Sequence, residues 1–128
     1  MKVCVFSGSR SEYGLLKELL KLLFKDSFFK TDFIVSGSHL SKKHGLSIKE
    51  ILDDKIKIKK KFDLDLKSST AFDICQNFSD INSKINFFFK TNKYDALILL
   101  GDRYESLAVA IAAYINRIPI VHIHGGEK

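Results

Sequence analysis

The feature that most constrains the fold of this 128-residue chain is the alternation of short apolar runs with segments of helical periodicity. The apolar runs mostly end at glycine and are typical of strands that are buried on both faces. We expect strands within residues 2–8, 30–38, 54–67, 94–102 and 118–126. We expect helices within residues 11–25, 45–54, 69–93 and 104–117. Strands that alternate with helices in this way predict an α/β fold, with a parallel sheet and helices on both of its faces.

The composition is that of an ordinary globular protein, with 45% hydrophobic and 28% charged residues. One hydrophobic core is expected at this length, since single domains commonly run about 100–150 residues. Cys4 and Cys75 stand in apolar stretches rather than at metal or redox spacings, so a reduced, cytoplasmic protein is expected. The apolar run at residues 2–8 is too short for a signal peptide or a membrane span, so we expect no membrane partner.

The net charge of +6 comes in large part from one lysine-rich segment. In residues 54–67, DKIKIKKKFDLDLK, Ile56 and Ile58 alternate with lysines, and Leu64 and Leu66 alternate with aspartates. This pattern predicts an edge strand that its charges protect from mispairing. The alternative is a patch that binds nucleic acid, but no aromatic residue stands between the lysines of residues 55–61 to stack on bases. We therefore expect no nucleic-acid partner.

The segments that follow four of the expected strands combine glycine with polar or charged side chains. They are SGSRSEYG (7–14), SGSHLSKKHG (36–45), LGDRYES (100–106) and HIHGGEK (122–128). The carboxyl ends of parallel strands lie along one edge of a sheet, where ligands bind, so we expect these segments to meet there. The formation of a turn does not require arginine, aspartate and histidine. This edge is therefore the expected place of function.

In the first of these segments, a helix is expected to start near Ser11 or Glu12, just after Gly8. Exposed amides at a helix start favour an anion, and the planar guanidinium of Arg10 suits phosphate oxygens. The alternative is that Ser9 or Ser11 caps the helix while Arg10 points to water. The segment has neither the spacing of a P-loop nor that of G-x-G-x-x-G.

Asp102 follows the most clearly buried of the expected strands, and Arg103 stands beside it. Asp102 either caps the next helix or takes part in chemistry. Arg103 can hold a phosphate, keep Asp102 ionised, or do both.

His122 and His124 are expected on one face of the last strand, because side chains alternate along a strand. They are candidates for metal ligands, although no third ligand is evident, or for a core histidine bonded to backbone. Gly125 and Gly126 allow the backbone to approach a ligand closely, with Glu127 at the rim.

Three blocks of this sequence, taken in order, resemble the amino-terminal half of the hydrolysing UDP-N-acetylglucosamine 2-epimerases. They are GSRSEYGLL, SGSHLS and LGDRYESLAVAIAAYINRIPIVHIHGGE, and the likeness runs from residue 2 to the last residue. The resemblance implies a Rossmann-like, incomplete amino-terminal half of a two-domain glycosyltransferase-B-like fold, with the nucleotide sugar between the two halves. It also implies that residues 1–128 form a truncated first domain and that the carboxyl-terminal domain is absent.

The resemblance implies conversion of UDP-N-acetylglucosamine to N-acetylmannosamine and UDP, or the same reaction on a diacetamido-sugar analogue of sialic-acid-type biosynthesis. The sugar would lose its nucleotide by elimination and then take up water, with no metal and no cofactor. The family pattern makes Asp102, His124 and Glu127 catalytic candidates, and Arg10, Arg103 and His39 substrate-binding candidates. His124 stands where mammalian members carry a glutamate, and histidine also shuttles protons near neutral pH. Which group takes the C2 proton stays open.

Two other functions are compatible with these residues. One is a non-catalytic nucleotide- or phosphate-binding half-module of a glycosyltransferase-B-like protein. The other is a flavodoxin-like regulatory domain, which would want an acidic cluster where SGSRSE supplies arginine.

The resemblance also bears on the isolated chain, which we expect to show no appreciable turnover. We further expect homo-oligomers, or association with a missing carboxyl-terminal half. Phe87, Phe88 and Phe89 are expected to form an apolar ridge that packs on a sheet or on another domain. Where this ridge is exposed, it and unpaired strand edges would favour such contacts.

Overall fold

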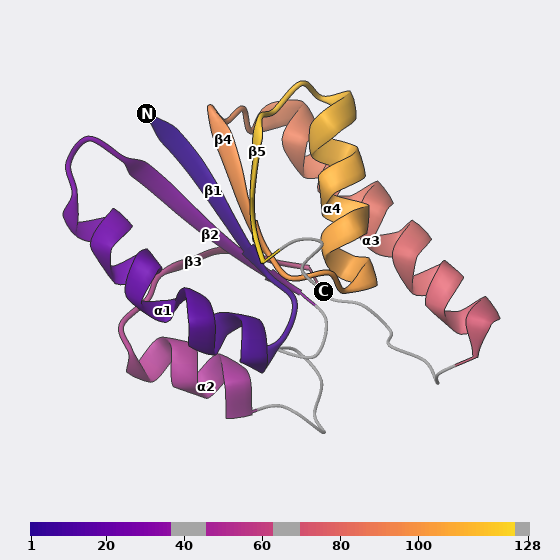
Figure 1. Cartoon of the computed structure of the whole chain (residues 1–128), viewed down its shortest axis with the longest axis horizontal. Coiled ribbons are helices and arrows are strands. Elements are labelled where there is room, and N and C mark those ends of the chain that lie inside the picture. Colours follow the sequence, from indigo (N-terminus) through magenta and orange to yellow (C-terminus); the bar gives the residue numbers. More distant parts are fainter. Residues whose placement is uncertain (37–45, 63–69, 125–128) are drawn as a thin grey trace.

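The computed structural model describes residues 1–36, 46–62 and 70–124, which form a five-stranded sheet between two layers of helices (Figure 1). The strands are β1 (Lys2–Ser7), β2 (Lys30–Ser36), β3 (Ile58–Phe62), β4 (Ala96–Leu100) and β5 (Ile120–Ile123). The helices are α1 (Arg10–Lys25), α2 (Leu46–Asp53), α3 (Ala71–Thr91) and α4 (Tyr104–Ile115). The predicted order of strands and helices is confirmed. None of the helices in the described ranges has the length and apolar character needed to cross a bilayer.

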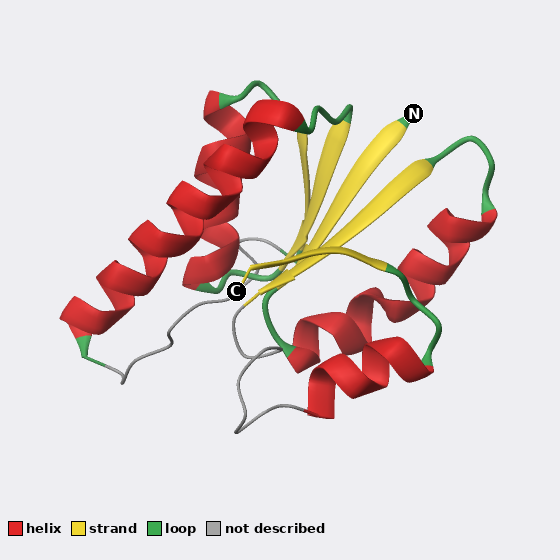
Figure 2. Cartoon of the chain, turned by 180° about the vertical axis from the view of Figure 1, so that it is seen from behind, coloured by secondary structure: helices red, strands yellow, loops and turns green. Residues whose placement is uncertain are grey.

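The strands stand in the order β3-β2-β1-β4-β5, and all neighbouring pairs are parallel. The chain starts in the middle of the sheet, adds β2 and β3 on one side, and crosses over through α3 to add β4 and β5 on the other. Helices α1 and α2 cover one face of the sheet, and α3 and α4 cover the opposite face (Figures 1 and 2). The carboxyl ends of all strands therefore lie along one edge, where β1, β4 and β5 are neighbours.

Each face of the sheet has its own apolar core. Along β1, Cys4 and Phe6 enter the core under α3 and α4, whereas Val3 and Val5 enter the core under α1 and α2. All four side chains are almost completely buried. A central strand that is covered on both faces needs apolar residues at every position, which is why it reads as a continuous apolar run.

β3 lies at one edge of the sheet, as the lysine-rich pattern predicts, and its three lysines are exposed. Strict alternation would put Ile58 and Phe62 on the same face, yet Ile58 packs against the α1–α2 core and Phe62 lies in the α3–α4 core. The pairing with β2 shifts register between Phe33 and Ile34. This bulge adds one residue to β3 and moves the later side chains to the other face. Residues 63–67 of the predicted strand lie outside the described residues.

The ridge of Phe87, Phe88 and Phe89 packs on the sheet in part, as one alternative predicted, and its expected exposure is wrong for Phe88 and Phe89. Phe89 is fully buried and Phe88 is 8% exposed, whereas Phe87 is 73% exposed. The rings of Phe88 and Phe89 each lie 6.2 Å from the ring of Tyr94, between centroids, within the α3–α4 core. Consecutive residues on a helix point about 100° apart, so three in a row cannot share one face. Most of this aromatic surface therefore stabilises the chain's own core.

Candidate functional site

The loops that follow β1, β4 and β5 meet at the carboxyl edge of the sheet, and they carry most of the predicted site residues. Arg10 is the first residue of α1, Asp102 and Arg103 lie between β4 and α4, and His124 directly follows β5. Because the three strands are neighbours in the sheet, these residues stand on neighbouring loops of one edge.

Some of the predicted site residues cannot be placed on this edge by the structure. His39 and Glu127 lie outside the described residues, and so does the side chain of Arg10, although its backbone begins α1. Their roles stay predictions.

Hydrogen bonds connect the loop after β4 to the end of β5. The amide N–H of Gly101 donates to the carbonyl oxygen of Ile123 over 2.9 Å. The ring nitrogen Nε2 of His122 is in hydrogen-bond contact with the carbonyl oxygen of Gly101. Gly101 has a φ of +79°, a left-handed conformation that favours glycine. This turn brings the segment that carries Asp102 beside the end of β5.

The two histidines do not share a strand face, contrary to expectation. β5 ends at Ile123, and His124 follows in a turn with a φ of +56°. A left-handed residue turns the backbone out of the extended conformation, so strand alternation stops before His124. His122 contacts backbone, as the alternative to a metal ligand predicted, but it is exposed and does not lie in the core. In the described part of the chain, no group of three or more His, Cys, Asp or Glu side chains is arranged to hold a metal ion.

Asp102 is exposed, and it does not cap the helix that follows. The N-cap position of α4 is held by Arg103, and among the described residues no side chain accepts a capping hydrogen bond there. The capping alternative for Asp102 is therefore wrong. Its carboxylate remains a candidate for chemistry at the edge.

Ser9 caps α1, as the alternative for the first loop predicted, whereas the direction of the Arg10 side chain lies outside the described residues. Its Oγ accepts the amide N–H of Glu12 over 3.3 Å, and it donates to Oε2 of the same residue over 2.8 Å. The carboxylate of Glu12 thus folds back onto the helix start and supplies the negative charge that the helix dipole favours there. A phosphate at this helix start would have to share it with Glu12.

Two buried carboxylates, Glu12 and Glu105, lie at the base of these loops, and neither was among the predicted site residues. Glu12 is 5% exposed and Glu105 is 1% exposed. The hydroxyl of Ser106 donates to Oε1 of Glu12 over 3.3 Å, which joins α4 to α1. A Cβ atom on Gly8 would lie only 3.4 Å from the Cβ of Glu105. The first loop therefore packs closely against both acids.

Glu105 holds the guanidinium of Arg103 by two hydrogen bonds. Nε donates to Oε2 over 3.2 Å, and Nη2 donates to Oε1 over 3.1 Å. The side chain of Arg103 is 46% exposed while that of Glu105 is 1% exposed, so the guanidinium is held from inside and reaches the surface. The hydrogen bond to Glu105 is the main reason why the pKa of Arg103 is raised. Arg103 therefore keeps its positive charge at this edge.

The pKa of Glu12 is raised above that of an ordinary glutamate because burial disfavours its charged form. The hydrogen bond from Ser9 and the charge of Arg103 oppose this rise, and the charge of Glu105 adds to it. The edge thus combines two buried acids, a half-exposed arginine and an exposed aspartate.

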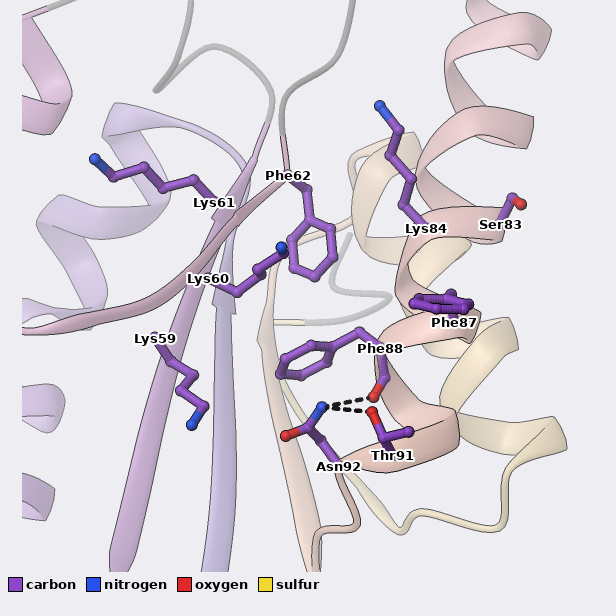
Figure 3. Close-up of a pocket in the computed structure, with 10 residues that line it drawn as sticks. All are labelled: Lys59, Lys60, Lys61, Phe62, Ser83, Lys84, Phe87, Phe88, Thr91 and Asn92. Atoms are coloured by element: carbon purple, nitrogen blue, oxygen red, sulfur yellow. Dashed lines mark hydrogen bonds between the residues drawn. The ribbon is translucent and has the colours of Figure 1, made fainter.

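A groove of about 690 Å³ lies elsewhere, between β3 and α3 (Figure 3). Phe62, Phe87 and Phe88 give it an apolar lining, and Lys60 extends toward Phe62. The described residues that line it come from β3, from α3 and from the Asn92 cap, and none comes from the loops after β1, β4 or β5. The groove is therefore separate from the candidate site.

The profile of one protein family, described as UDP-N-acetylglucosamine 2-epimerase, matches residues 21–128. The chain belongs to this family. It is 39% identical over 127 residues to the polysialic acid biosynthesis protein P7 of Escherichia coli, a match that covers 99% of this chain and 32% of that protein. It is 36% identical over 126 residues to the GDP/UDP-N,N'-diacetylbacillosamine 2-epimerase (hydrolyzing) of Campylobacter jejuni, with 98% and 33% covered. The chain thus spans about a third of the length of these relatives.

The fold also matches solved structures of epimerases. The crystal structure of UDP-GlcNAc 2-epimerase from Neisseria meningitidis bound to UDP-GlcNAc superposes with a TM-score of 0.82 and 21% identity. The match covers 100% of this chain and 33% of that one. At this identity the likeness shows the fold alone, and it agrees with the predicted parallel sheet with helices on both faces. The predicted family resemblance is confirmed by the profile match, which contains the second and third sequence blocks, and by the relatives that align with almost the whole chain.

Proposed function

We propose that this chain supplies the amino-terminal site residues of a hydrolysing nucleotide-sugar 2-epimerase. Its substrate is UDP-N-acetylglucosamine, which yields N-acetylmannosamine and UDP, or a diacetamido-sugar analogue. The observation that carries the proposal is the gathering of Asp102, Arg103 and His124 on neighbouring loops at one edge of the sheet. The Campylobacter relative named for diacetylbacillosamine and the Neisseria structure bound to UDP-GlcNAc support this substrate class.

The reaction has two steps, and both need proton transfer. In the elimination, the bond from C1 to the nucleotide oxygen breaks, the diphosphate leaves with the electron pair, and a base removes the C2 hydrogen as a proton. In the hydration, C1 takes the hydroxyl group of water and C2 takes a proton with inverted configuration. Positioned acid and base groups contribute about 100- to 10,000-fold to such rates. Asp102, His124 and Glu127 are the candidates, and the first two are exposed at the edge.

The departing diphosphate needs positive charge beside it. Charge that grows on a leaving group is stabilised most by donors that are already in place. Arg103 provides a half-exposed guanidinium at the carboxyl edge of the sheet. Arg10 and His39 are the further substrate-binding candidates. Arginine suits this task because its planar donors match the oxygens of a phosphate.

A second candidate function is a half-module that binds the nucleotide without catalysis. The observation that favours it is the half-exposed guanidinium of Arg103, which is held in place by Glu105 and can bind a phosphate without any chemistry. A substrate that lies between two halves of a protein would meet only part of its site on this chain. We therefore expect the isolated chain to release no appreciable N-acetylmannosamine, and measurable release would contradict this expectation.

A chimera tests the proposal. Residues 1–128 replace the matching third of the Campylobacter relative, and release of nucleoside diphosphate is measured with the UDP sugars of N-acetylglucosamine and diacetylbacillosamine. We expect turnover of at least one sugar, and Asp102→Asn should lower kcat about 100- to 10,000-fold while UDP affinity is kept. The matched control is Asp80→Asn, at an exposed position of α3, which should change nothing.

The other outcomes of this experiment discriminate between the two functions. A chimera that melts cooperatively and binds UDP but turns over neither sugar favours the half-module. A folded chimera that neither binds UDP nor releases it contradicts both functions.

A further inference from the structure

The charge cluster of Glu12, Arg103 and Glu105 is not explained by packing. Both glutamates are almost completely buried. The charge of Glu105 raises the pKa of Glu12, and the charges of both glutamates raise the pKa of Arg103. Burying charges requires desolvation, and well-packed apolar residues in place of a buried ion pair are often neutral or stabilising. A cluster of this kind at the edge that holds the candidate site therefore has a reason other than stability.

The geometry of the Arg103–Glu105 pair shows what the cluster does locally. Glu105 takes the donors Nε and Nη2 of the guanidinium, which fixes both the plane of the group and the direction in which it points. Nη1 is not used in these two bonds. With 46% of the side chain exposed, the outer edge of the guanidinium reaches the surface. A bidentate contact gives this directional control in addition to energy.

Glu12 connects this pair to the first loop. Its carboxylate accepts hydrogen bonds from Ser9 at the start of α1 and from Ser106 on α4. Ser106 directly follows Glu105 in the first turn of α4. Glu12 therefore contacts the same turn that carries Glu105. The charge of Arg103 also acts on Glu12, because it opposes the rise in the pKa of Glu12.

We propose that Glu105 is a positioning residue that aims the guanidinium of Arg103 at the departing diphosphate, with Glu12 bracing the turn that carries the pair. The inference rests on the proposed function, because that function supplies the diphosphate. It adds two residues to the site, neither of which touches the reacting atoms.

The sign of one binding effect separates this proposal from simple electrostatics. Removing a negative charge beside an anion site strengthens anion binding if charge alone decides. If Glu105 acts by positioning Arg103, the same removal weakens binding, because the guanidinium loses its fixed orientation. Glu105→Gln keeps the size of the side chain. It therefore removes the charge and one acceptor of the paired hydrogen bonds to Arg103, but it does not change the packing volume.

The experiment is a double-mutant cycle on the affinity of the chain for inorganic pyrophosphate and for UDP, measured by calorimetry. We expect Glu105→Gln to weaken both affinities about tenfold and Glu105→Asp, which draws the carboxylate back, to weaken them less. In an Arg103→Ala background, Glu105→Gln should have no further effect, because the two residues act as one unit. The matched control is Glu18→Gln, at an exposed glutamate on α1.

A second readout follows the guanidinium directly. The Nε–H signal of Arg103 in a nitrogen-edited NMR spectrum should exchange slowly with water in the native chain and rapidly in Glu105→Gln. It should shift when pyrophosphate is added. Melting curves of each variant show whether the fold is kept, and Glu105→Asp serves if Glu105→Gln does not fold.

Three results would overturn the inference. Unchanged or tighter pyrophosphate binding by Glu105→Gln would show that charge alone acts, and the proposed function would stand. An equal loss in the Arg103→Ala background would show that Glu105 does not work through Arg103. A native chain that binds neither pyrophosphate nor UDP would remove the inference together with the diphosphate site of the proposed function.

Discussion

The two ends of the sheet both use polar side chains, but they use them differently. At the amino end, the hydroxyl of Tyr94 donates to Oδ2 of Asp32 over 2.7 Å. The amide N–H of Lys2 donates to Oδ2 of Asp95 over 2.8 Å. The first contact links the segment before β4 to β2 across the intervening strand β1, and the second links β1 to the segment before its neighbour β4. Burial raises the pKa of Tyr94, so its hydroxyl remains a donor.

At the carboxyl end, two buried glutamates surround one arginine, and an exposed aspartate stands beside it. Here the charges exceed what is needed to join the loops. We infer that the polar contacts at the amino end stabilise the fold, whereas the charges at the carboxyl end serve binding and chemistry. Substitutions at the amino end should therefore lower the free energy of unfolding without weakening ligand binding. Substitutions at the carboxyl end should weaken ligand binding with little change in the free energy of unfolding.

The largest effect on stability is expected from Phe89→Ala. Phe89 is fully buried at the end of α3, where its ring packs against those of Phe88 and Tyr94. Removal of a buried phenylalanine ring costs about 3–5 kcal/mol, because the cavity fills only partly. Urea denaturation should report a loss of this size in the free energy of unfolding. A loss below about 1 kcal/mol would contradict the role given to the aromatic core at the amino end.

Tyr94→Phe should have a smaller effect on stability and none on binding. The substitution keeps the ring but leaves Oδ2 of Asp32 without its donor. The free energy of unfolding should fall by about 1–2 kcal/mol, since an acceptor loses its partner in a partly buried place. Tyr114→Phe, at a side chain that is 78% exposed, is the control. Weaker pyrophosphate binding by Tyr94→Phe would break the comparison between the two ends.

Glu12→Gln should change the pH dependence of stability, with a sign opposite to that of an ordinary ion pair. The pKa of Glu12 is raised in the folded chain, so the folded state binds the proton more tightly than the unfolded state. Its contribution to stability is present below the ordinary glutamate pKa of about 4.3 and is lost as pH rises through the folded pKa. Glu12→Gln should lack this loss, so its free energy of unfolding, measured by urea denaturation, should depend less on pH.

The control for this profile is Glu18→Gln, whose parent side chain is 81% exposed. It should keep the pH dependence of the native chain. A Glu12→Gln profile that falls more steeply than the native one as pH rises would contradict the assigned direction of the pKa.

The sheet was predictable because burial on both faces leaves a direct trace in the sequence. β1 and β4 read as continuous apolar runs, and the lysines of β3 marked it as an edge. The bulge in β3 was not predictable, because it depends on the register with β2 rather than on β3 itself. The end of β5 was missed for a similar reason. A left-handed histidine is unusual, and nothing in the alternation of residues 120–124 announces it.

The candidate site was predicted in part. Strand-end loops pointed to Asp102, Arg103 and His124, because parallel strands bring their carboxyl ends together. Glu12 and Glu105 were missed, because a glutamate in the first turn of a helix normally needs only the helix dipole as an explanation. One signal was present: the pattern R-x-E occurs at the start of both α1 and α4. Its meaning depends on the packing of two loops that lie far apart in sequence.

The smallest effect is expected from Phe87→Ala, and it tests whether burial or position along α3 decides stability. Phe87 lies two residues before Phe89 on the same helix, but it is 73% exposed and lines the groove beside β3. Its loss should change the free energy of unfolding by no more than about 0.5 kcal/mol, as for most surface substitutions. Alanine also has a higher helix propensity than phenylalanine, which offsets the lost contacts. A loss as large as that of Phe89→Ala would mean that the groove side of α3 is covered in solution, and sedimentation of the native chain would then reveal an associated species.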